Sequence, residues 1–542
     1  MRSLSIRLLL SVVFGLALSL AFLEHDFYVL SWLAFVPLFF ALQGSTFKQA
    51  YVLSLVGSFV AFATGKYWII DFIVISKGAT DATSLFFAFL YWFYCAHLFV
   101  FAILLTLWLK RNSRLPLAII FPVVFTAFTA GYPLLFSMHL GDTQVRFTAA
   151  LQAIEYTGVH GLNAIVALAN VWVYSLLHKA ICRIPGTTAN SVFSRLEIIM
   201  PGIILVAWFA YGSLTLEAWQ QKITQWPSLK VGMIQSNEIP SLGKKVSYPG
   251  YSASYLPEME MSERLAKLDL DLIVWPESQY KSYLDNNFVA DAFKRSVADM
   301  GTAILFQDFE TIAASGETES IRQFNSAVFI DAKGEQAPSY RKIKRIPFGE
   351  YLPIVSDNPH LKRLASSYLG EFLNEISAGE SYVSMPHPSL SLVPLICYET
   401  TFPSFVANAL DAALATERKS AVLVGMSNDG WFGSTHQPKQ HITVSALRAV
   451  ENRTPLVHVA NNGPSIVVAA SGEITFEADF QQAGGYVAEL KYADWQNTQE
   501  EQTKQGSFYS RHPSLFIYSM YVVLVLMLAH TLLLRLFFNK DR

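Results

Sequence analysis

The chain is poor in charge and in cysteine. Asp, Glu, Lys and Arg make up 15% of its 542 residues and hydrophobic residues 52%, which is too apolar for an average soluble protein. The formal net charge of −2 gives no basic excess, so we expect no nucleic-acid partner. Of the three cysteines, Cys95 and Cys182 lie in or beside long apolar segments, which leaves Cys397 without an evident disulfide partner.

The hydrophobic excess is local and predicts about eight membrane spans. A helix that crosses a bilayer needs about 20 apolar residues, and such windows recur over roughly the first 220 residues and the last 30. At 542 residues the chain is too long for one ordinary domain, so at least two parts are expected. The second window is short, so a tilted or re-entrant segment stays open, as do totals of seven or nine spans. The windows lie near residues 4–23, 27–43, 50–70, 84–109, 115–136, 157–181, 196–218 and 513–538.

Basic residues gather in alternate loops and predict the orientation. Because Lys and Arg in short loops mark the cytoplasmic side, both termini are expected there and residues 219–512 on the opposite side. For a bacterium this means a multi-pass protein of the inner membrane with residues 219–512 in the periplasm. The basic residues on the cytoplasmic side are Arg2, Arg7, Lys48, Lys110, Arg111, Arg114, Lys179, Arg183, Arg195, Arg535, Lys540 and Arg542.

Residues between the last two windows have the rhythm of an α/β domain. Short apolar runs predict strands, and helical patterns at 255–268, 288–300 and 441–453 separate several of them. We therefore expect a transmembrane helical domain at 1–218, an α/β domain at 219–490, a linker at 491–512 and a last transmembrane helix with its cytoplasmic tail at 513–542. The expected strands are 230–235, 272–275, 303–306, 327–330, 392–396, 421–425, 456–460 and 465–470.

Three reactive side chain types follow strand-like runs. Glu277 comes just after the run that Pro276 stops, and Cys397 ends the run 392–396. Four basic residues cluster at 341–345, either as a solvated patch or with one cation directed inward. A thiol of pKa about 8.5 needs a base to become a nucleophile, and a cation can stabilise an oxyanion. The alternative is that Cys397 is a small buried hydrophobic residue.

The motifs around these residues resemble the nitrilase, or carbon–nitrogen hydrolase, superfamily. The matching segments are Trp-Pro-Glu277, Tyr-Arg-Lys342 before Pro-Phe-Gly-Glu350, Cys397-Tyr-Glu399, and Ser-Asn-Asp-Gly-Trp-Phe-Gly at 427–433. The helical spans on both sides resemble its apolipoprotein N-acyltransferase branch, so the resemblance covers essentially the whole chain. It implies a nitrilase-like α-β-β-α sandwich beside the helical membrane domain.

The resemblance also implies roles for particular residues. Cys397 would be the nucleophile, Glu277 the general base and Lys342, rather than Lys344, the oxyanion-stabilising cation. Glu350, Tyr398 and Glu399 would be accessory active-site residues, and Trp431 and Phe432 either line a lid or acyl pocket or belong to the core. The branch's usual Trp after the first strand is absent, so any gating role falls to Tyr248 or Tyr251 or is missing.

The reaction implied is acyl transfer through a thioester. Cys397 would take an acyl chain from a phospholipid and pass it to the N-terminal diacylglyceryl-cysteine of a lipoprotein precursor. A monomer without cofactor or metal is expected. Two rivals stay open, which are a membrane-anchored amidase or nitrilase acting on a small substrate, and a transporter or scaffold with a degenerate enzyme domain. The intramembrane His97, Glu155 and Asn163 would either line a lipid path or form hydrogen bonds between helices.

Overall fold

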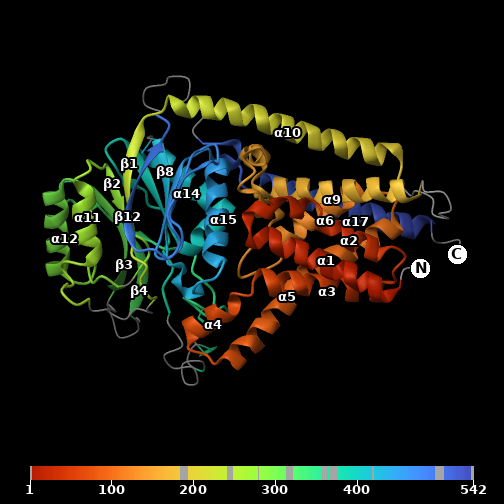
Figure 1. Cartoon of the computed structure of the whole chain (residues 1–542), viewed down its shortest axis with the longest axis horizontal. Helices are drawn as coiled ribbons and strands as arrows, with labels where there is room; N and C mark the ends of the chain where they lie inside the picture. The colour runs from red at the N-terminus through yellow and green to blue at the C-terminus, as the bar shows by residue number, and fades with distance from the viewer. Residues whose placement is uncertain are drawn as a thin grey trace. The chain divides into compact units, whose positions relative to one another are not determined.

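The computed structural model divides into two units, one helical and one α/β (Figure 1). The helical unit comprises 1–70, 80–218 and 512–542, and the α/β unit comprises 71–79 and 219–511. Segment 71–79 thus joins the α/β unit although its neighbours in sequence belong to the helical one. The structure describes residues 3–182, 193–240, 248–278, 280–312, 321–356, 358, 360–361, 364, 375–417, 420–494 and 506–538. Arg2, Arg183, Lys540, Arg542 and much of the predicted linker lie outside these residues.

Six helices of the described chain are long and apolar enough to cross a membrane. They correspond to six of the eight predicted spans, and the other two are shorter apolar segments, Asp26–Leu42 and Leu117–Gly131. The segment at 26–42 is made up of a 3-10 helix, η1, followed by the eight-residue α2. The helices are α1 (Leu4–Leu23), η1 (His25–Trp32), α2 (Phe35–Leu42), α3 (Phe47–Gly65), α4 (Ile69–Lys77), α5 (Asp81–Asn112), α6 (Leu117–Gly131), η2 (Leu140–Gln144), α7 (Thr148–Leu151), α8 (Ile154–Thr157), α9 (Val159–Cys182), α10 (Arg195–Thr224) and α17 (Leu515–Phe538).

Small residues and buried amides join the helices of the first unit. Gly15 of α1 packs against α3 so closely that a Cβ there would lie 2.3 Å from the carbonyl oxygen of Gly57. Asn163 accepts a hydrogen bond from the Leu140 N–H at 2.8 Å and donates to Thr129 Oγ1 at 3.0 Å. Bonds of this kind between elements support the helix-joining role of Asn163 over a lipid path.

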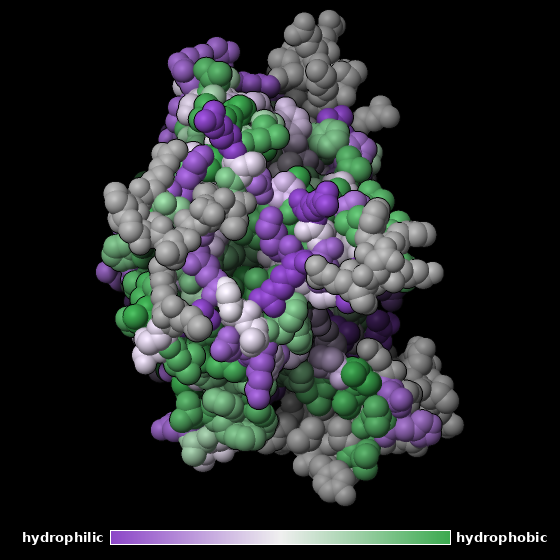
Figure 2. Space-filling view, turned by 90° about the vertical axis from the view of Figure 1, so that its right-hand side faces the viewer, coloured by the Kyte–Doolittle hydropathy of each residue, from purple (hydrophilic) through white to green (hydrophobic). Residues whose placement is uncertain are grey.

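Both ends of the helical unit's chain lie at one end of the bundle. The start of α1 and the end of α17 are together there (Figure 1). Figure 2 looks onto this end and shows hydrophilic residues across its middle, with hydrophobic residues around part of its rim.

Two six-stranded sheets form the second unit. Their strand orders are β12-β1-β2-β3-β4-β5 and β11-β10-β9-β8-β7-β6, with parallel pairing along β1-β2-β3 and β7-β8-β9. The strands are β1 (Ser228–Gln235), β2 (Leu272–Val274), β3 (Ala303–Ile312), β4 (Arg322–Ile330), β5 (Tyr340–Arg341), β6 (Met385–Pro386), β7 (Leu390–Ile396), β8 (Ser420–Ser427), β9 (Leu456–Ala460), β10 (Ile466–Val468), β11 (Ile474–Glu477) and β12 (Gly484–Lys491).

The sheets pack face to face between two layers of helices. One core cluster combines residues of both sheets, among them Val274 and Val424, so the inner faces meet. A second cluster joins the outer face of the first sheet to α11 (Pro257–Ala266) and α12 (Asn287–Met300). On the second sheet, α14 (Pro403–Glu417) lies against β7 and β8, and α15 (Gln437–Asn452) against β9. This confirms the predicted α-β-β-α sandwich.

Candidate active site

The carboxyl ends of strands from both sheets meet at one site. Glu277 follows β2 of the first sheet, while Cys397 and Asn428 follow β7 and β8 of the second. The Glu277 Oε2 atom accepts a hydrogen bond from the Asn428 N–H at 3.2 Å, which ties the two sheets together here. Side chains far apart in sequence are thereby held by rigid strand ends rather than by free loops.

Lys342 lies between two carboxylates. Its Nζ atom is 3.6 Å from Glu277 Oε1 and donates to Glu350 Oε1 at 2.8 Å. The lysine is fully buried, and although burial alone would lower its pKa, the two carboxylates raise it above its ordinary value. Lys342 is therefore a fixed cation at neutral pH.

The remaining carboxylate oxygens are also occupied. Glu277 Oε1 accepts from Asn325 Nδ2 at 2.7 Å, and Glu350 Oε2 accepts from the Ile346 N–H at 2.8 Å. Asn325 belongs to β4, and its carbonyl oxygen accepts from the Lys342 N–H. No sequence pattern pointed to Asn325, and Asn428 lies in the 427–433 motif without a predicted role, because the contacts of both depend on strand pairing at a distance.

Cys397 occupies a sharp turn between β7 and the 3-10 helix η4 (Cys397–Thr401). Its φ of 50° lies in the left-handed region, which is uncommon for a residue with a Cβ and costs about 1–3 kcal/mol. Burial raises the pKa of its thiol well above the ordinary value, Glu277 adds to the rise and Lys342 opposes it. The resting side chain is therefore a neutral thiol, and its deprotonation requires a base that acts as the sulfur attacks.

Glu399 holds this turn in place. Its fully buried carboxylate accepts hydrogen bonds from the Ile396 N–H at 2.8 Å, the Ile343 N–H at 2.7 Å and the Tyr340 hydroxyl at 2.7 Å. The contacts join the turn that carries Cys397 to the segment that carries Lys342. Tyr398 is buried with its ring edge-on to Phe402, at 4.8 Å between ring centroids.

The other basic residues of the 341–345 cluster point elsewhere. Arg341 forms two hydrogen bonds with Glu310, at 2.6 and 2.7 Å. The Lys344 ammonium lies over the rings of Phe402 and Phe405, and Arg345 donates to the Ile376 carbonyl at 2.9 Å. Among the described residues of this cluster, Lys342 is the one whose charge reaches Glu277 and Glu350.

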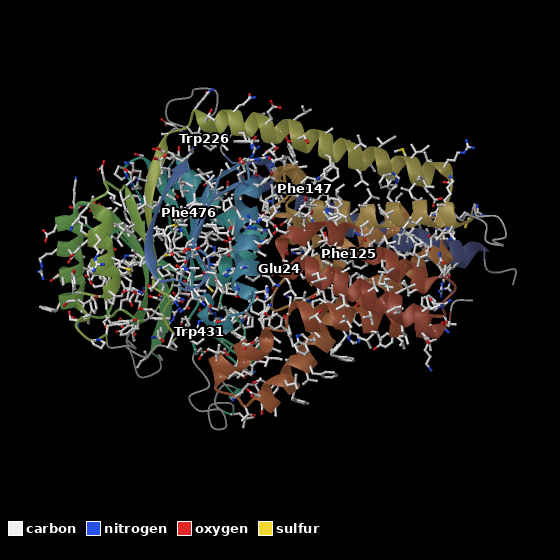
Figure 3. All side chains as sticks on the ribbon, in the orientation of Figure 1. Glu24, Phe125, Phe147, Trp226, Trp431 and Phe476 are labelled. Atoms are coloured by element: carbon white, nitrogen blue, oxygen red, sulfur yellow. The ribbon has the colours of Figure 1, made fainter. Side chains whose placement is uncertain are left out.

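A cavity of about 120 Å³ opens beside the thiol. Trp431 lines it, and Figure 3 shows this residue at the lower side of the α/β unit, where its loop follows β8. Phe432 is buried and stacks on Phe72 of α4, with ring centroids 5.1 Å apart. The residues that line the cavity are Phe72, Ser76, Lys77, Glu277, Ser278, Phe309, Gln323, Asn325, Ile346, Gly349, Glu350, Ile376, Cys397, Asn428 and Trp431.

Neither candidate gating tyrosine lines this cavity. The Tyr248 hydroxyl donates to Glu238, and the Tyr251 hydroxyl donates to Glu260. Residues of α4 do line the cavity, and no sequence pattern predicted this. These residues lie about 200 positions before Glu277, in the predicted loop between the windows at 50–70 and 84–109.

A buried ion pair supports the backbone of Cys397 from behind. His441 Nδ1 lies 2.8 Å from Asp429 Oδ1, and its Nε2 lies 3.2 Å from the Cys397 carbonyl oxygen. Ser427 Oγ donates to Asp429 Oδ2 at 2.9 Å and lies 2.8 Å from His458 Nε2. One carboxylate oxygen of Asp429 and one ring nitrogen each of His441 and His458 lie within 4.8 Å of one another, a spacing that a metal cation would also allow. In this structure the three side chains belong to the hydrogen-bond network just described.

In this pair Asp429 carries a negative charge and His441 a positive one. Burial alone would lower the pKa of His441, but the Asp429 carboxylate outweighs it and the pKa rises above 6.5. Burial alone would raise the pKa of Asp429, but His441 outweighs it and that pKa falls. The stabilisation from His441 is thus fully present below pH 6.5 and is lost as the pH rises through the raised pKa.

His441→Gln is expected to lower the thermal midpoint of unfolding by roughly 5 °C at pH 5.5, and by clearly less at pH 9. The glutamine cannot carry the charge that faces Asp429, whereas at pH 9 the wild-type imidazole has lost much of its own. Scanning fluorimetry of the purified protein across this pH range measures both values. His458→Gln is the control, because burial lowers the pKa of His458 to about 3 and leaves it neutral throughout. Parallel pH curves for the two variants would contradict the charged pair.

Known proteins resemble both parts of the chain. Residues 14–172 match the apolipoprotein N-acyltransferase N-terminal domain, and residues 254–500 match the carbon–nitrogen hydrolase family. An apolipoprotein N-acyltransferase from Geobacter metallireducens is 26% identical over 94% of this chain and 92% of its own length. One from Pseudomonas putida is 25% identical, over 88% and 89% respectively. Among solved structures, an amidase from Nesterenkonia sp. is 18% identical with a TM-score of 0.34, over 51% of this chain and 95% of its own.

Proposed function

Because the chain belongs to the apolipoprotein N-acyltransferase family, we propose that it acylates the N-terminal diacylglyceryl-cysteine of lipoproteins with a chain taken from a phospholipid. The observation that carries this proposal is the group formed by Cys397, Glu277 and Lys342 in a chain whose described part has six helices fit to cross a membrane. A thiol beside a carboxylate and a fixed cation suits acyl transfer. The helices suit two substrates whose chains stay in a bilayer.

The first step forms a thioester. Glu277 removes the Cys397 proton as the sulfur attacks the carbonyl carbon of the phospholipid ester. The oxyanion that develops is stabilised by the Lys342 ammonium and by a backbone N–H next to the nucleophile. When the intermediate collapses, the C–O bond breaks, and the lysophospholipid oxygen leaves with the proton that Glu277 had taken. The raised pKa of Cys397 supports this coupled transfer over a preformed thiolate.

The second step forms the amide. The α-amino group of the diacylglyceryl-cysteine attacks the thioester carbonyl, and Glu277 accepts a proton from the nitrogen. Collapse breaks the C–S bond, and the Cys397 sulfur is reprotonated from Glu277. Glu350 and Glu399 position Lys342 and the Cys397 turn through the contacts described above, while Tyr398, Trp431 and Phe432 shape the surroundings of the acyl chain.

The arrangement in the cell follows from the loop charges. The protein is a multi-pass bacterial membrane protein, and the Lys and Arg bias supports cytoplasmic termini with a periplasmic catalytic domain. Domain limits at 1–218, 219–490, 491–512 and 513–542 form part of the proposal, with segment 71–79 added to the catalytic domain. We expect a monomer that works without a cofactor.

One incubation experiment distinguishes the proposed acyltransferase activity from hydrolysis. We expect the purified protein, mixed with phospholipid, to gain one acyl mass by intact mass spectrometry and to lose it in hydroxylamine. A diacylglyceryl lipopeptide added next is expected to take the acyl group on its amine. Release of ammonia from simple amides with no acylated peptide would favour the hydrolase instead. Full biological activity of a Cys397→Ala variant would favour a scaffold or transporter.

A further inference from the structure

One cation in the catalytic cavity has no role in the mechanism above. Lys77 is the last residue of α4, and it lines the same cavity as Cys397. It reaches this position because 71–79 packs as part of the α/β unit. A lysine suits the C-terminal end of a helix, but that preference does not require it to face a cavity.

Lys77 lacks the partner that a half-buried ammonium needs. The two carboxylates of the cavity, Glu277 and Glu350, already face Lys342 at 3.6 and 2.8 Å. Within the described ranges Lys77 makes no ion pair and no side-chain hydrogen bond. Burial lowers the pKa of its ammonium, because partial removal from water disfavours the charge. An anion bound in the cavity would supply the missing partner.

The rest of the wall suits a lipid. Phe72 lies one helical turn before Ser76 and Lys77, and its ring stacks on Phe432. Together with Trp431 it gives the cavity an apolar side next to the thiol. The cavity therefore presents a nucleophile, an apolar wall and one unpaired cation, which are complementary to the ester, the acyl chain and a charged headgroup.

We propose that Lys77 binds the phosphodiester of the phospholipid that donates the acyl chain. The inference rests on the proposed function, in which only the donor carries this anion. The acceptor offers an amine and no phosphate. Lys77 would thus favour the donor in the first step and, after the lysophospholipid leaves, would disfavour the ammonium form of the acceptor, which cannot attack.

Lys77→Gln tests the proposal with two donors. With phosphatidylglycerol vesicles, the single-turnover rate of thioester formation is expected to fall about tenfold to a hundredfold, as for loss of a charge-assisted hydrogen bond. With 4-nitrophenyl palmitate, which has no phosphate, the fold decrease in rate is expected to be about one tenth of that with phosphatidylglycerol, or smaller. Lys77→Arg, which keeps the charge, is expected to recover most of the phospholipid rate. The matched control is Lys333→Gln on an exposed turn of the same unit.

The possible results distinguish a failure of the proposed function from a failure of the role proposed for Lys77. If the wild-type protein forms no thioester with phospholipid, the proposed function fails. If the wild type forms it and Lys77→Gln slows both donors equally, or neither, the phosphate-binding role is overturned while the function stands. Loss confined to the phospholipid donor, with recovery by arginine, supports Lys77 as the residue that recognises the donor headgroup.

Discussion

Cys397→Ala gains no acyl mass from phospholipid, and its transfer of acyl groups to a lipopeptide falls by at least about 10⁴-fold. The reason is that no other described group at this site can form the thioester. Cys397→Ser is expected to fall nearly as far, because the neutral-thiol mechanism leaves Glu277 with a hydroxyl that is a much weaker acid than a thiol. Intact mass spectrometry and single-turnover kinetics measure both variants.

A cysteine outside the site provides the control for this experiment. Cys182→Ser is expected to keep the adduct, because Cys182 belongs to α9 of the helical unit. Cys397→Ser is also expected to keep the wild-type thermal midpoint within a few degrees, since the turn is held through its backbone by Glu399 and His441. An adduct of normal stoichiometry in Cys397→Ala would exclude this cysteine as the nucleophile.

The sequence predicted the strands that carry Glu277 and Cys397 because they are continuous apolar runs. Such runs are buried on both faces, and β2 and β7 have no exposed position. Strands β11 and β12 were missed for the opposite reason. Exposed residues alternate along both strands with half-buried or buried ones, and β12 pairs with β1 from about 250 residues away. Local patterns carry no information about pairing at that distance.

The basic run 341–345 shows a second limit of prediction from sequence. In the basic run 341–345, charge alone does not say which residue points inward, and the resemblance rather than the pattern selected Lys342. The structure supplies the physical reason, because the chain is extended from β5 into Lys342. Tyr340 faces the core, Arg341 faces Glu310 and Lys342 faces inward again, which follows the two-residue period of a strand. The register in which β5 pairs with β4 determines whether the even-numbered or the odd-numbered residues of this segment point into the core.

The roles of residues that act through distant contacts were beyond prediction. Asn325, Asn428 and His441 touch the site by side chains or backbone that only the folded sheets bring together. The same holds for Phe72 and Lys77, which lie in the predicted loop between the windows at 50–70 and 84–109. Rigid strand ends were thus predictable, whereas the groups that orient them required the tertiary structure.

Lys342→Met is expected to lower the rate of thioester formation by about 10²–10³-fold or more, as when an oxyanion donor is removed. It also leaves Glu277 and Glu350 facing each other without their shared cation. Breaking a buried ion pair from one side costs about 3–5 kcal/mol, so the free energy of unfolding falls as well. Single-turnover acylation with phospholipid and a thermal melt of the same sample measure the two effects together.

Two further variants separate catalysis from stability. Lys344→Met removes a lysine two positions away whose ammonium lies 5.7 Å and 5.9 Å from aromatic ring centroids, and it is expected to cost about 1 kcal/mol and less than about threefold in rate. Adding Glu350→Gln to Lys342→Met removes one of the two unpaired charges. The double variant should therefore regain part of the lost stability while the acylation rate stays low. If the rate recovers along with stability, Lys342 serves the fold rather than the oxyanion.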